Sequence, residues 1–413
     1  MKTKHFIISL LALSLTCLTT ACSSEDSDDS VISEKEEGQE DEKGMVKLTS
    51  ANLTEEGYFD GVMYYKITSN SPLEVCVAKA EKSAVNIVIP SKVSIDGRIH
   101  KCTSVGEKAF YKCSNLTSIT IPNSIQIIRD SAFADCGSIE SIMIPSSINT
   151  IENYAFYNCT GLKVVNIEDI AKWCNVSFSD IYSNPLTYAH HLYKDNNEVN
   201  DLVIPNSVTS IGDIVFNGCT GLTSVIIPNS VTRIGGVAFQ QCRSLSSITI
   251  PNSVTTIEVA AFNCCTGLKE VTIGDFVTYI GIRAFSQCDL LESVIIGKSV
   301  KKIDNKAFNR CKKLTSVIIP DSVTTIGESA FSECTHLASV TLPNSLKTIL
   351  ADAFQSCPSL SAIRCHSTKP PKLYNNPFPN ELYSKGTLYI PIGSKTAYQS
   401  SEYWNYFKNI IEE

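Results

Sequence analysis

Hydrophobic and polar residues alternate along this chain in a pattern that returns every 23 residues. The stretch from residue 222 reads LTSVIIPNSVTRIGGVAFQQC, and the stretch from residue 245 reads LSSITIPNSVTTIEVAAFNCC. A period of about 20–50 residues is typical of proteins built from stacked repeats, each forming one coil. A cysteine marks each copy at a step of 23, except for one step of 60, which is one period plus an insertion of 37: Cys113, Cys136, Cys159, Cys219, Cys242, Cys265, Cys288, Cys311, Cys334 and Cys357.

Each copy begins with a predicted β-strand. In residues 222–227 the alternation places Val225 and Ile227 inward and Ser224 and Ile226 outward. The next residue, Pro228, lacks an N–H and therefore turns the chain out of the sheet. Stacking one such strand per coil predicts a parallel sheet along one face.

The second half of each copy predicts the opposite side of the coil. Val231 and Ile234 point back inward, which indicates a second short strand on the opposite wall. The following residues up to Cys242 are expected to form a short helical turn, with Phe239 in the centre of the coil. Ten such phenylalanines between Phe110 and Phe354 are expected to stack along the core. The sequence thus predicts an α/β solenoid of about twelve coils, capped at both ends.

These repeats resemble a known family. The pattern C-x-x-L-x-S-[IV]-x-[IVL]-P-x-S-[IV]-x-x-I-x-x-x-A-F resembles the 23-residue class of bacterial leucine-rich repeats found in BspA-like surface proteins. The resemblance runs from about Ala84 to the C-terminus and departs from the pattern at the insertion and at Val215. It implies a leucine-rich-repeat fold and adhesion to host matrix proteins or to other cells.

The regions outside the repeat suggest export. Residues 1–21 read as a signal peptide, and LTTAC before residue 23 resembles a lipobox in which Cys22 is acylated; an ordinary signal peptide is the alternative. Residues 22–45 are predicted to form an acidic, disordered linker. Residues 46–83 are predicted to form an N-terminal β cap, residues 84–365 the solenoid with an insertion at 168–198, and residues 366–413 a C-terminal cap with a strand at Leu388–Pro391 and a helix or turn carrying Trp404, Phe407 and Ile411.

Charge and localisation follow from the same regions. The net charge is −7, of which the segment after Cys22 contributes −8 and the signal +2, so the folded body is nearly neutral. A nearly neutral body gives no reason to expect nucleic-acid binding. The expectation is a protein anchored by lipid to the outer membrane, at the cell surface.

The chemistry-bearing residues point away from catalysis. The ten periodic cysteines are predicted to be buried free thiols, because their side chains run parallel along the stack. Cys76, Cys102, Cys174, Cys264 and Cys365 are the more plausible disulfide candidates. His190 and His191 lack a second ligand pair, so no metal site is expected. With no catalytic motif, the chain is predicted to be a non-enzyme without a cofactor.

The outward strand positions are the predicted binding surface. They form a broad face of small polar and apolar side chains, which suits a large partner such as a protein and offers no pocket for a small ligand. The candidate residues are Ser118, Thr120, Ser141, Met143, Ser224, Ile226, Ser247, Thr249, Thr272, Ser293, Ile295, Ser316, Ile318, Ser339 and Thr341.

The insertion offers an alternative. Its aromatic residues include Trp173, Tyr182 and Tyr188. They predict either a protruding recognition element or, as the favoured interpretation, a self-packed excursion with its own small core. If they bind sugars, the protein is a glycan-binding accessory protein; a purely structural spacer is the third hypothesis.

Overall fold

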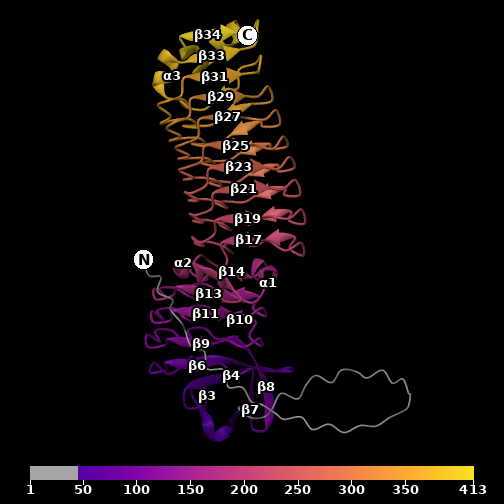
Figure 1. Ribbon diagram of the computed structural model, residues 1–413, viewed down its shortest axis with the longest axis vertical. Helices are drawn as coiled ribbons and strands as arrows, with labels where there is room; N and C mark the ends of the chain where they lie inside the picture. The colour runs from indigo at the N-terminus through magenta and orange to yellow at the C-terminus, as the bar shows by residue number, and fades with distance from the viewer. Residues whose placement is uncertain (1–44) are drawn as a thin grey trace, which may run out of the picture. The chain divides into compact units, whose positions relative to one another are not determined.

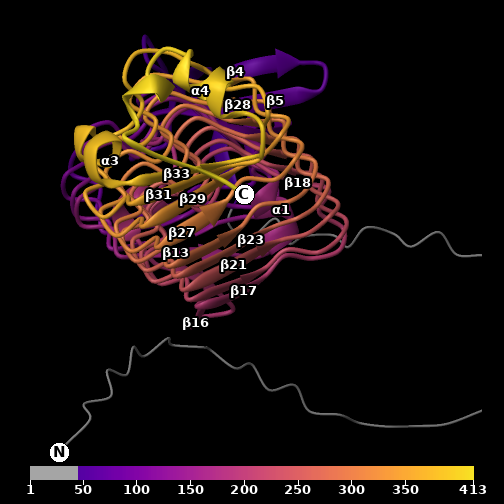
Figure 2. The same ribbon diagram turned by 90° about the horizontal axis from the view of Figure 1, so that it is seen from above.

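The 23-residue repeats wind into coils that stack through parallel strands (Figure 1). The computed structural model describes residues 45–413. The predicted signal peptide, Cys22 and nearly all of the acidic linker lie outside the described residues. Seen along the stack, successive coils nearly superpose (Figure 2), and one continuous hydrophobic core fills them.

The first wall is the predicted parallel sheet. Neighbouring strands are offset by one repeat, as in the pairs Ser247–Glu270 and Ile250–Ile273. The twelve predicted strands are present, and the wall also continues into the insertion and the C-terminal end, so twelve was too low a count. In the described chain its strands are β6 (Asn86–Val88), β9 (Ser118–Thr120), β11 (Ser141–Ile144), β13 (Val164–Ile167), β15 (Leu192–Lys194), β17 (Asp201–Val203), β19 (Ser224–Ile226), β21 (Ser247–Ile250), β23 (Glu270–Ile273), β25 (Ser293–Ile295), β27 (Ser316–Ile318), β29 (Ser339–Leu342), β31 (Ala362–Cys365), β33 (Thr387–Ile390) and β34 (Asn409–Glu412).

The second wall consists of two-residue strands, as predicted. Each places one apolar side chain in the core, such as Ile234 or Ile257. The strands are β10 (Ile127–Ile128), β12 (Thr150–Ile151), β14 (Ser177–Phe178), β18 (Ser210–Ile211), β20 (Arg233–Ile234), β22 (Thr256–Ile257), β24 (Tyr279–Ile280), β26 (Lys302–Ile303), β28 (Thr325–Ile326), β30 (Thr348–Ile349) and β32 (Lys372–Leu373).

The third side of each coil, called the turn side here, consists of consecutive turns and not of a regular helix. Val237 and Gln241 both have a left-handed backbone, with φ of 61°. Because these two left-handed residues turn the backbone away from a helical path, the N–H of Phe239 donates to the carbonyl of Ala261 in the next coil at 2.8 Å. The hydrogen bonds that a helix would make within one coil are thus made partly between coils. The described α-helices lie elsewhere: α1 (Ile170–Cys174), α2 (Leu186–Ala189), α3 (Asn380–Lys385) and α4 (Lys395–Gln399).

The predicted phenylalanine stack fills the centre. The Phe262 ring lies 5.2 Å from both Phe239 and Phe285, with interplanar angles of 5° and 1°. The stack is interrupted between Phe156 and Phe216 and extends to Phe378. The members are Phe110, Phe133, Phe156, Phe216, Phe239, Phe262, Phe285, Phe308, Phe331, Phe354 and Phe378.

The periodic cysteines lie beside this stack as free thiols. The Cys265 Sγ donates to the Phe239 carbonyl at 3.1 Å, and most other periodic thiols repeat this contact. Burial raises the pKa of Cys159 and Cys219 to about 12, so both are protonated at neutral pH. Every cysteine among the described residues is unpaired, including the five candidates for disulfide formation.

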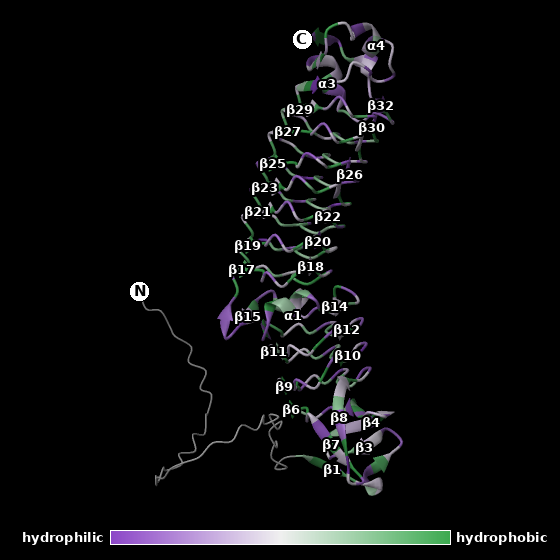
Figure 3. Cartoon of the chain, turned by 90° about the vertical axis from the view of Figure 1, so that its right-hand side faces the viewer, coloured by the Kyte–Doolittle hydropathy of each residue, from purple (hydrophilic) through white to green (hydrophobic). Residues whose placement is uncertain are grey.

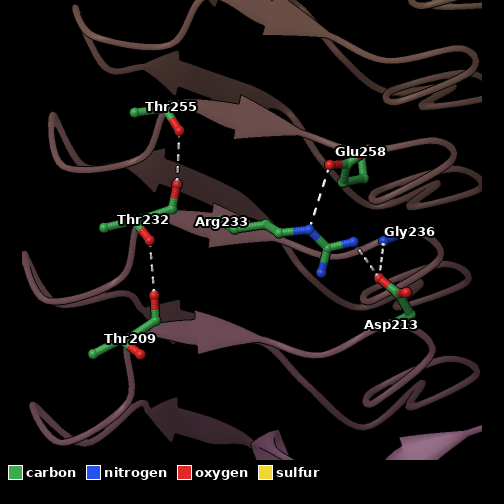
Figure 4. A network of polar contacts seen from close by, with 7 residues as sticks. All are labelled: Thr209, Asp213, Thr232, Arg233, Gly236, Thr255 and Glu258. Carbon is green, nitrogen blue, oxygen red and sulfur yellow. Dashed lines mark hydrogen bonds and ion pairs between the residues drawn. The ribbon is translucent and has the colours of Figure 1, made fainter.

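Polar contacts also join successive coils on the second wall (Figure 4). The Thr232 hydroxyl donates to the carbonyl of Thr209 at 3.1 Å, and Thr255 repeats the contact with Thr232 at 3.2 Å. Arg233 bridges three coils: its Nη2 lies 2.8 Å from Asp213 Oδ1, and its Nε lies 3.3 Å from Glu258 Oε1.

Separate elements cover the two ends of the core. At the N-terminal end, the strands β2 (Leu53–Thr54), β3 (Gly57–Phe59), β4 (Met63–Asn70) and β5 (Leu73–Ala80) pair antiparallel in sequence, following β1 (Val46–Leu48) and the 3-10 turn η1 (Ser50–Asn52). The β5 strand then pairs in parallel with β8 (Arg98–Val105), and β8 pairs antiparallel with β7 (Lys92–Ile95). The β8 strand also pairs in parallel with β10, which joins the cap to the second wall.

Of the helix and the turn expected at the C-terminal end, the structure forms a turn followed by a strand. Trp404 is buried in the 3-10 turn η2 (Trp404–Tyr406), and Phe407 is buried just after it. Ile411, however, lies on β34, which pairs in parallel with β33, and its side chain is 41% exposed. The apolar spacing at 404, 407 and 411 does not mark one helix face, because Ile410 is the inward residue of a final strand.

The insertion forms an additional coil. Its β14 pairs with β12 of the second wall, and β15 pairs with β13 of the first wall. Helices α1 and α2 connect these strands, and β15 then makes a hairpin with β16 (Asn197–Glu198). The expected self-packed excursion is therefore wrong, because its apolar residues join the common core.

Candidate functional site

The exposed side of the first wall carries two parallel rows of side chains. The serine row comprises Ser118, Ser141, Ser224, Ser247, Ser293, Ser316 and Ser339, which lie at equivalent strand positions. The outer row lies two residues further along each strand. It comprises Val88, Thr120, Met143, Asn166, Tyr193, Val203, Ile226, Thr249, Thr272, Ile295, Ile318, Thr341, Arg364, Tyr389 and Ile411.

The apolar members of the outer row are among the most exposed hydrophobic side chains of the described chain. Ile226, Ile295 and Ile318 are 60%, 64% and 71% exposed. The inward neighbours Val225 and Val317 are buried, so the strand alternation leaves these isoleucines without a packing role in the coil.

The structure adds two residues that the sequence pattern did not select. Val203 is 55% exposed and pairs directly with Ile226. Val88, at the N-terminal end of the same row, is 69% exposed. Both precede an Ile-Pro dipeptide as Ile226 does, which is the signal that would have identified them.

The apolar residues gather in two patches. Val203 and Ile226 form one, and Ile295 and Ile318, one repeat apart, form the other. Thr249 and Thr272 lie between the patches, and the Thr272 side chain is half-buried. Full burial of one exposed isoleucine contributes about 1.5–3 kcal/mol, so the two patches together offer substantial binding free energy.

Some serines of the row make hydrogen bonds to neighbouring strands of the same wall. Ser224 Oγ donates to Asp201 Oδ1 at 2.5 Å, and Ser118 Oγ donates to Asn86 Oδ1 at 2.6 Å. Hydrogen bonds from Ser224 and Thr223 lower the pKa of the exposed Asp201 carboxyl. These two serine hydroxyls are therefore engaged within the wall.

A hollow lies beside the first apolar patch. It has a volume of 340 Å³ and is lined by Val203, Asp201 and the β15–β16 hairpin, including Lys194 and Glu198. The hydrophilic hairpin stands out from the first wall in Figure 3. His191 Nδ1 lies 2.6 Å from Glu198 Oε1 at its base. The two-residue turn of Asp195 and Asn196, with φ of 51° and 61°, is a local sequence signal for this hairpin, although the hairpin lies inside the insertion and departs from the period.

The aromatic residues of the insertion do not form the protruding recognition element that was the alternative interpretation. Trp173 is buried, and its Nε1 donates to the Val215 carbonyl at 3.0 Å. Tyr188 is half-buried, and its hydroxyl accepts the Asn158 N–H at 2.9 Å. Tyr182 is half-buried as well.

An aromatic group does reach the surface on the turn side. Tyr154 and Tyr157 are exposed and pack around Tyr182, with ring centroids 5.9 Å and 5.4 Å from it. Tyr154 and Tyr157 belong to the regular repeat that precedes the insertion, which is why attention to the insertion alone missed them.

Two further structural observations concern other kinds of site. Among residues 45–413, no group of three or more His, Cys, Asp or Glu side chains is placed to hold a metal ion. In the same part of the chain, no helix combines the length and apolarity that a membrane crossing requires.

Comparison with known proteins gives one strong result. The model of the BspA type leucine rich repeat region matches in six copies, over residues 86–194, 187–315 and 301–385. No curated protein matches the chain.

Several solved structures are similar to this chain. A leucine rich cell surface protein from Faecalibacterium prausnitzii A2-165 is 25% identical, covers 75% of this chain and 94% of its own, and has a TM-score of 0.45. A leucine-rich repeat protein from Bacteroides ovatus ATCC 8483 is 25% identical over 83% and 97% of the two chains, with a TM-score of 0.49. The pneumococcal vaccine antigen PcpA is 17% identical over 86% and 97%, with a TM-score of 0.47.

Proposed function

Because the chain belongs to the BspA type leucine-rich-repeat family, we propose that it is a non-enzymatic surface protein that binds a macromolecular partner through the first wall. Leucine-rich-repeat proteins generally mediate protein binding. The partner is a protein, with host extracellular matrix as the first class to examine.

The observation that carries this proposal is the exposure of Ile226, Ile295 and Ile318 on a face to which every coil contributes. Isolated exposed apolar residues are ordinary on protein surfaces, but two apolar patches along one row of the same face offer a partner repeated contacts. The serine and threonine side chains between them add single hydrogen bonds of modest strength. Affinity therefore depends mainly on the isoleucines.

The test of the binding face adds charge to the apolar patches. The protein is the self-contained unit of residues 45–413, carrying Ile226→Lys with Ile295→Lys. The control adds the same two charges to the second wall, as Thr256→Lys with Thr325→Lys. Both variants are measured for saturable binding to a panel of purified matrix proteins, beside the unchanged protein.

The expected result is binding at least about tenfold weaker for the isoleucine variant, a loss of about 1.4 kcal/mol or more. The control variant binds normally, and the thermal midpoint of the isoleucine variant stays close to that of the unchanged protein because both side chains are exposed. Equal binding by both variants would exclude the first wall. If no matrix protein binds saturably, the hypothesis that the protein is a structural spacer is favoured instead.

The anchoring proposal concerns Cys22. An acylated Cys22 followed by an acidic linker would hold the repeats outside the outer membrane at the cell surface. Changing Cys22→Ser is expected to release the protein into the soluble fraction after cell fractionation. Unchanged membrane association of this variant contradicts a lipid anchor.

A glycan-binding role is the second candidate function. The exposed Tyr154 and Tyr157 beside Tyr182 favour it, because aromatic rings offer faces on which sugars stack. Trp173 is not available for this role, since its side chain is buried in the core. If Tyr154→Ala with Tyr157→Ala abolishes binding to an immobilised glycan, and the isoleucine variant has no effect on any partner, the glycan role replaces the first.

A further inference from the structure

A polar trough crosses four successive coils on the turn side, away from both walls of strands. It is a hollow of 380 Å³ that runs from Asn263 to Glu333, and every side chain that lines it is polar or charged. None of these residues belongs to the serine row, the outer row or the tyrosine group. The trough is therefore a separate feature of the surface, and its role does not depend on the function proposed above.

The repeat itself creates the trough. Residues two before and two after each core phenylalanine from Phe110 to Phe354 have a left-handed backbone, as at Arg283 (57°), Lys306 (58°) and Arg310 (63°). The residue directly after each phenylalanine forms the floor, where Ser286 is 2% exposed and Asn263 is 8% exposed. Equivalent side chains consequently recur along the trough once per coil, at the spacing of neighbouring parallel strands, about 4.8 Å.

The lining carries an excess of positive charge. Arg283, Lys306 and Arg310 lie in it with a single acidic residue, Glu333. Glu333 Oε2 lies 3.6 Å from Arg310 Nε, so that pair is partly neutralised. Arg283 and Lys306 form no ion pair with any residue in the described range 45–413. Two cationic groups are thus available to an anion from solution.

The floor contains an unsatisfied polar group. The Asn309 side chain donates to the Ser332 carbonyl at 3.0 Å, and the Ser332 hydroxyl donates to the Gln355 carbonyl at 3.0 Å. The Oδ1 of Asn263, by contrast, is buried and has no hydrogen-bond partner. A buried carbonyl oxygen without a partner costs stability, and rotation of the amide by 180° would present either its oxygen or its nitrogen to the trough.

We propose that this trough binds a linear acidic polysaccharide. Recurrence of polar side chains once per coil fits a polymer with repeating units better than a single small ion. The free cations of Arg283 and Lys306 would bind carboxylate or sulfate groups, and sugar hydroxyls, which both donate and accept, would satisfy Asn263 and its neighbours. The lining has no aromatic ring, which disfavours a neutral sugar chain held by stacking.

The experiment measures the binding of length-matched oligosaccharides to residues 45–413 by calorimetry. The probes are an oligogalacturonate, which carries carboxylates, a heparin-derived oligosaccharide, which carries sulfates, a neutral oligosaccharide and a poly-glutamate peptide. The test variant is Arg283→Gln with Lys306→Gln. The control is Lys108→Gln, which removes a positive charge from the equivalent repeat position of a coil outside the trough, where Lys108 is paired with Glu107 at 2.8 Å.

The proposal expects saturable binding of one or both acidic oligosaccharides, weakened at least about tenfold in the double variant and unchanged in Lys108→Gln. The acidic oligosaccharide that binds more tightly shows whether the trough prefers carboxylate or sulfate groups. Binding should also fall as salt is raised. Failure of both acidic probes to bind, equal binding by the double variant, or equally tight binding of poly-glutamate overturns the proposal.

The floor supplies an independent test. Asn263→Ala removes no hydrogen bond made within the described chain, so the free energy of unfolding should stay the same or rise. If Asn263 contacts the ligand, the same variant binds the preferred oligosaccharide more weakly. Loss of stability together with unchanged binding would assign Asn263 a structural role and contradict its part in the site.

Discussion

The regular coils of residues 200–365 and the single coil built by the insertion reach the same cross-section by different means. In the regular coils, a phenylalanine from each repeat stacks on the next, with centroids 5.2–5.4 Å apart from Phe216 to Phe354. The inserted coil interrupts this stack. Instead, Asn184 is fully buried there, and its Nδ2 donates to the carbonyls of Ile214 and Val215 at 2.7 and 3.1 Å.

The difference shows what the period does and does not determine. A regular coil is stabilised by apolar groups that every neighbour repeats, so its contacts are interchangeable between coils. The inserted coil depends on specific donors, Asn184 and Trp173, which meet the backbone of the following coil. Hydrophobic stacking thus stabilises the regular coils along the array, and specific hydrogen bonds to the next coil stabilise the one irregular coil.

The largest expected effect is the loss of a ring from the middle of the stack. Phe262→Ala removes a fully buried side chain held between Phe239 and Phe285, and should lower the free energy of unfolding by about 3–5 kcal/mol. Urea denaturation followed by circular dichroism measures this. Phe354 is not a weaker end position, because Phe378 and the C-terminal strands cover it, so Phe354→Ala should cost a similar amount. A loss below about 1 kcal/mol at Phe262 would contradict stacking as the main support of the array.

An intermediate effect is expected in the inserted coil. Asn184→Ala removes both donated hydrogen bonds and leaves the buried N–H of Leu186 without its acceptor, Asn184 Oδ1. The expected loss of stability is about 1–3 kcal/mol. The control Asn197→Ala, on the exposed hairpin of the same coil, should change stability by less than about 0.5 kcal/mol. Equal losses for both variants would mean that Asn184 does not secure this coil.

The smallest effect is expected from the exposed bridge on the second wall. Arg233→Met removes contacts with Asp213 and Glu258 but keeps much of the aliphatic stem, and the Arg233 side chain is 39% exposed. A loss of about 1 kcal/mol or less is expected, and it should shrink further at high salt. Denaturation at low and high ionic strength measures it. A larger loss of stability that does not depend on salt would mean that the bridge stabilises the protein as much as a core residue does.

Much of the fold could be predicted because the same 23-residue pattern of apolar and polar residues recurs in most coils. Alternation such as Val225 and Ile227 against Ser224 and Ile226 identified the strands, and the structure places all four as expected. The turn side was less predictable: the residues around Phe239 have the local appearance of a helical turn, but their hydrogen bonds run to the next coil, which a single repeat does not reveal.

The irregular parts could not be predicted for the same reason. Trp173 and Phe178 lie outside the period, so the sequence favoured a small separate core for them, whereas the structure places both in the common core. The outward positions of Ile226, Ile295 and Ile318 followed from the strand pattern, whereas the hollow between Val203 and the β15–β16 hairpin depends on how the insertion folds. The proposed binding role of this face rests on the exposure of these three isoleucines.

The most direct test of the proposed binding role is hydroxyl-radical footprinting of residues 45–413, alone and bound to the matrix protein that binds it saturably. This method reads the solvent accessibility of side chains, so no substitution is needed. The account predicts that oxidation of Ile226, Ile295 and Ile318 falls on binding, while Tyr279 on the second wall stays as reactive as before. Unchanged oxidation of the three isoleucines, with protection confined to another face, would contradict the account.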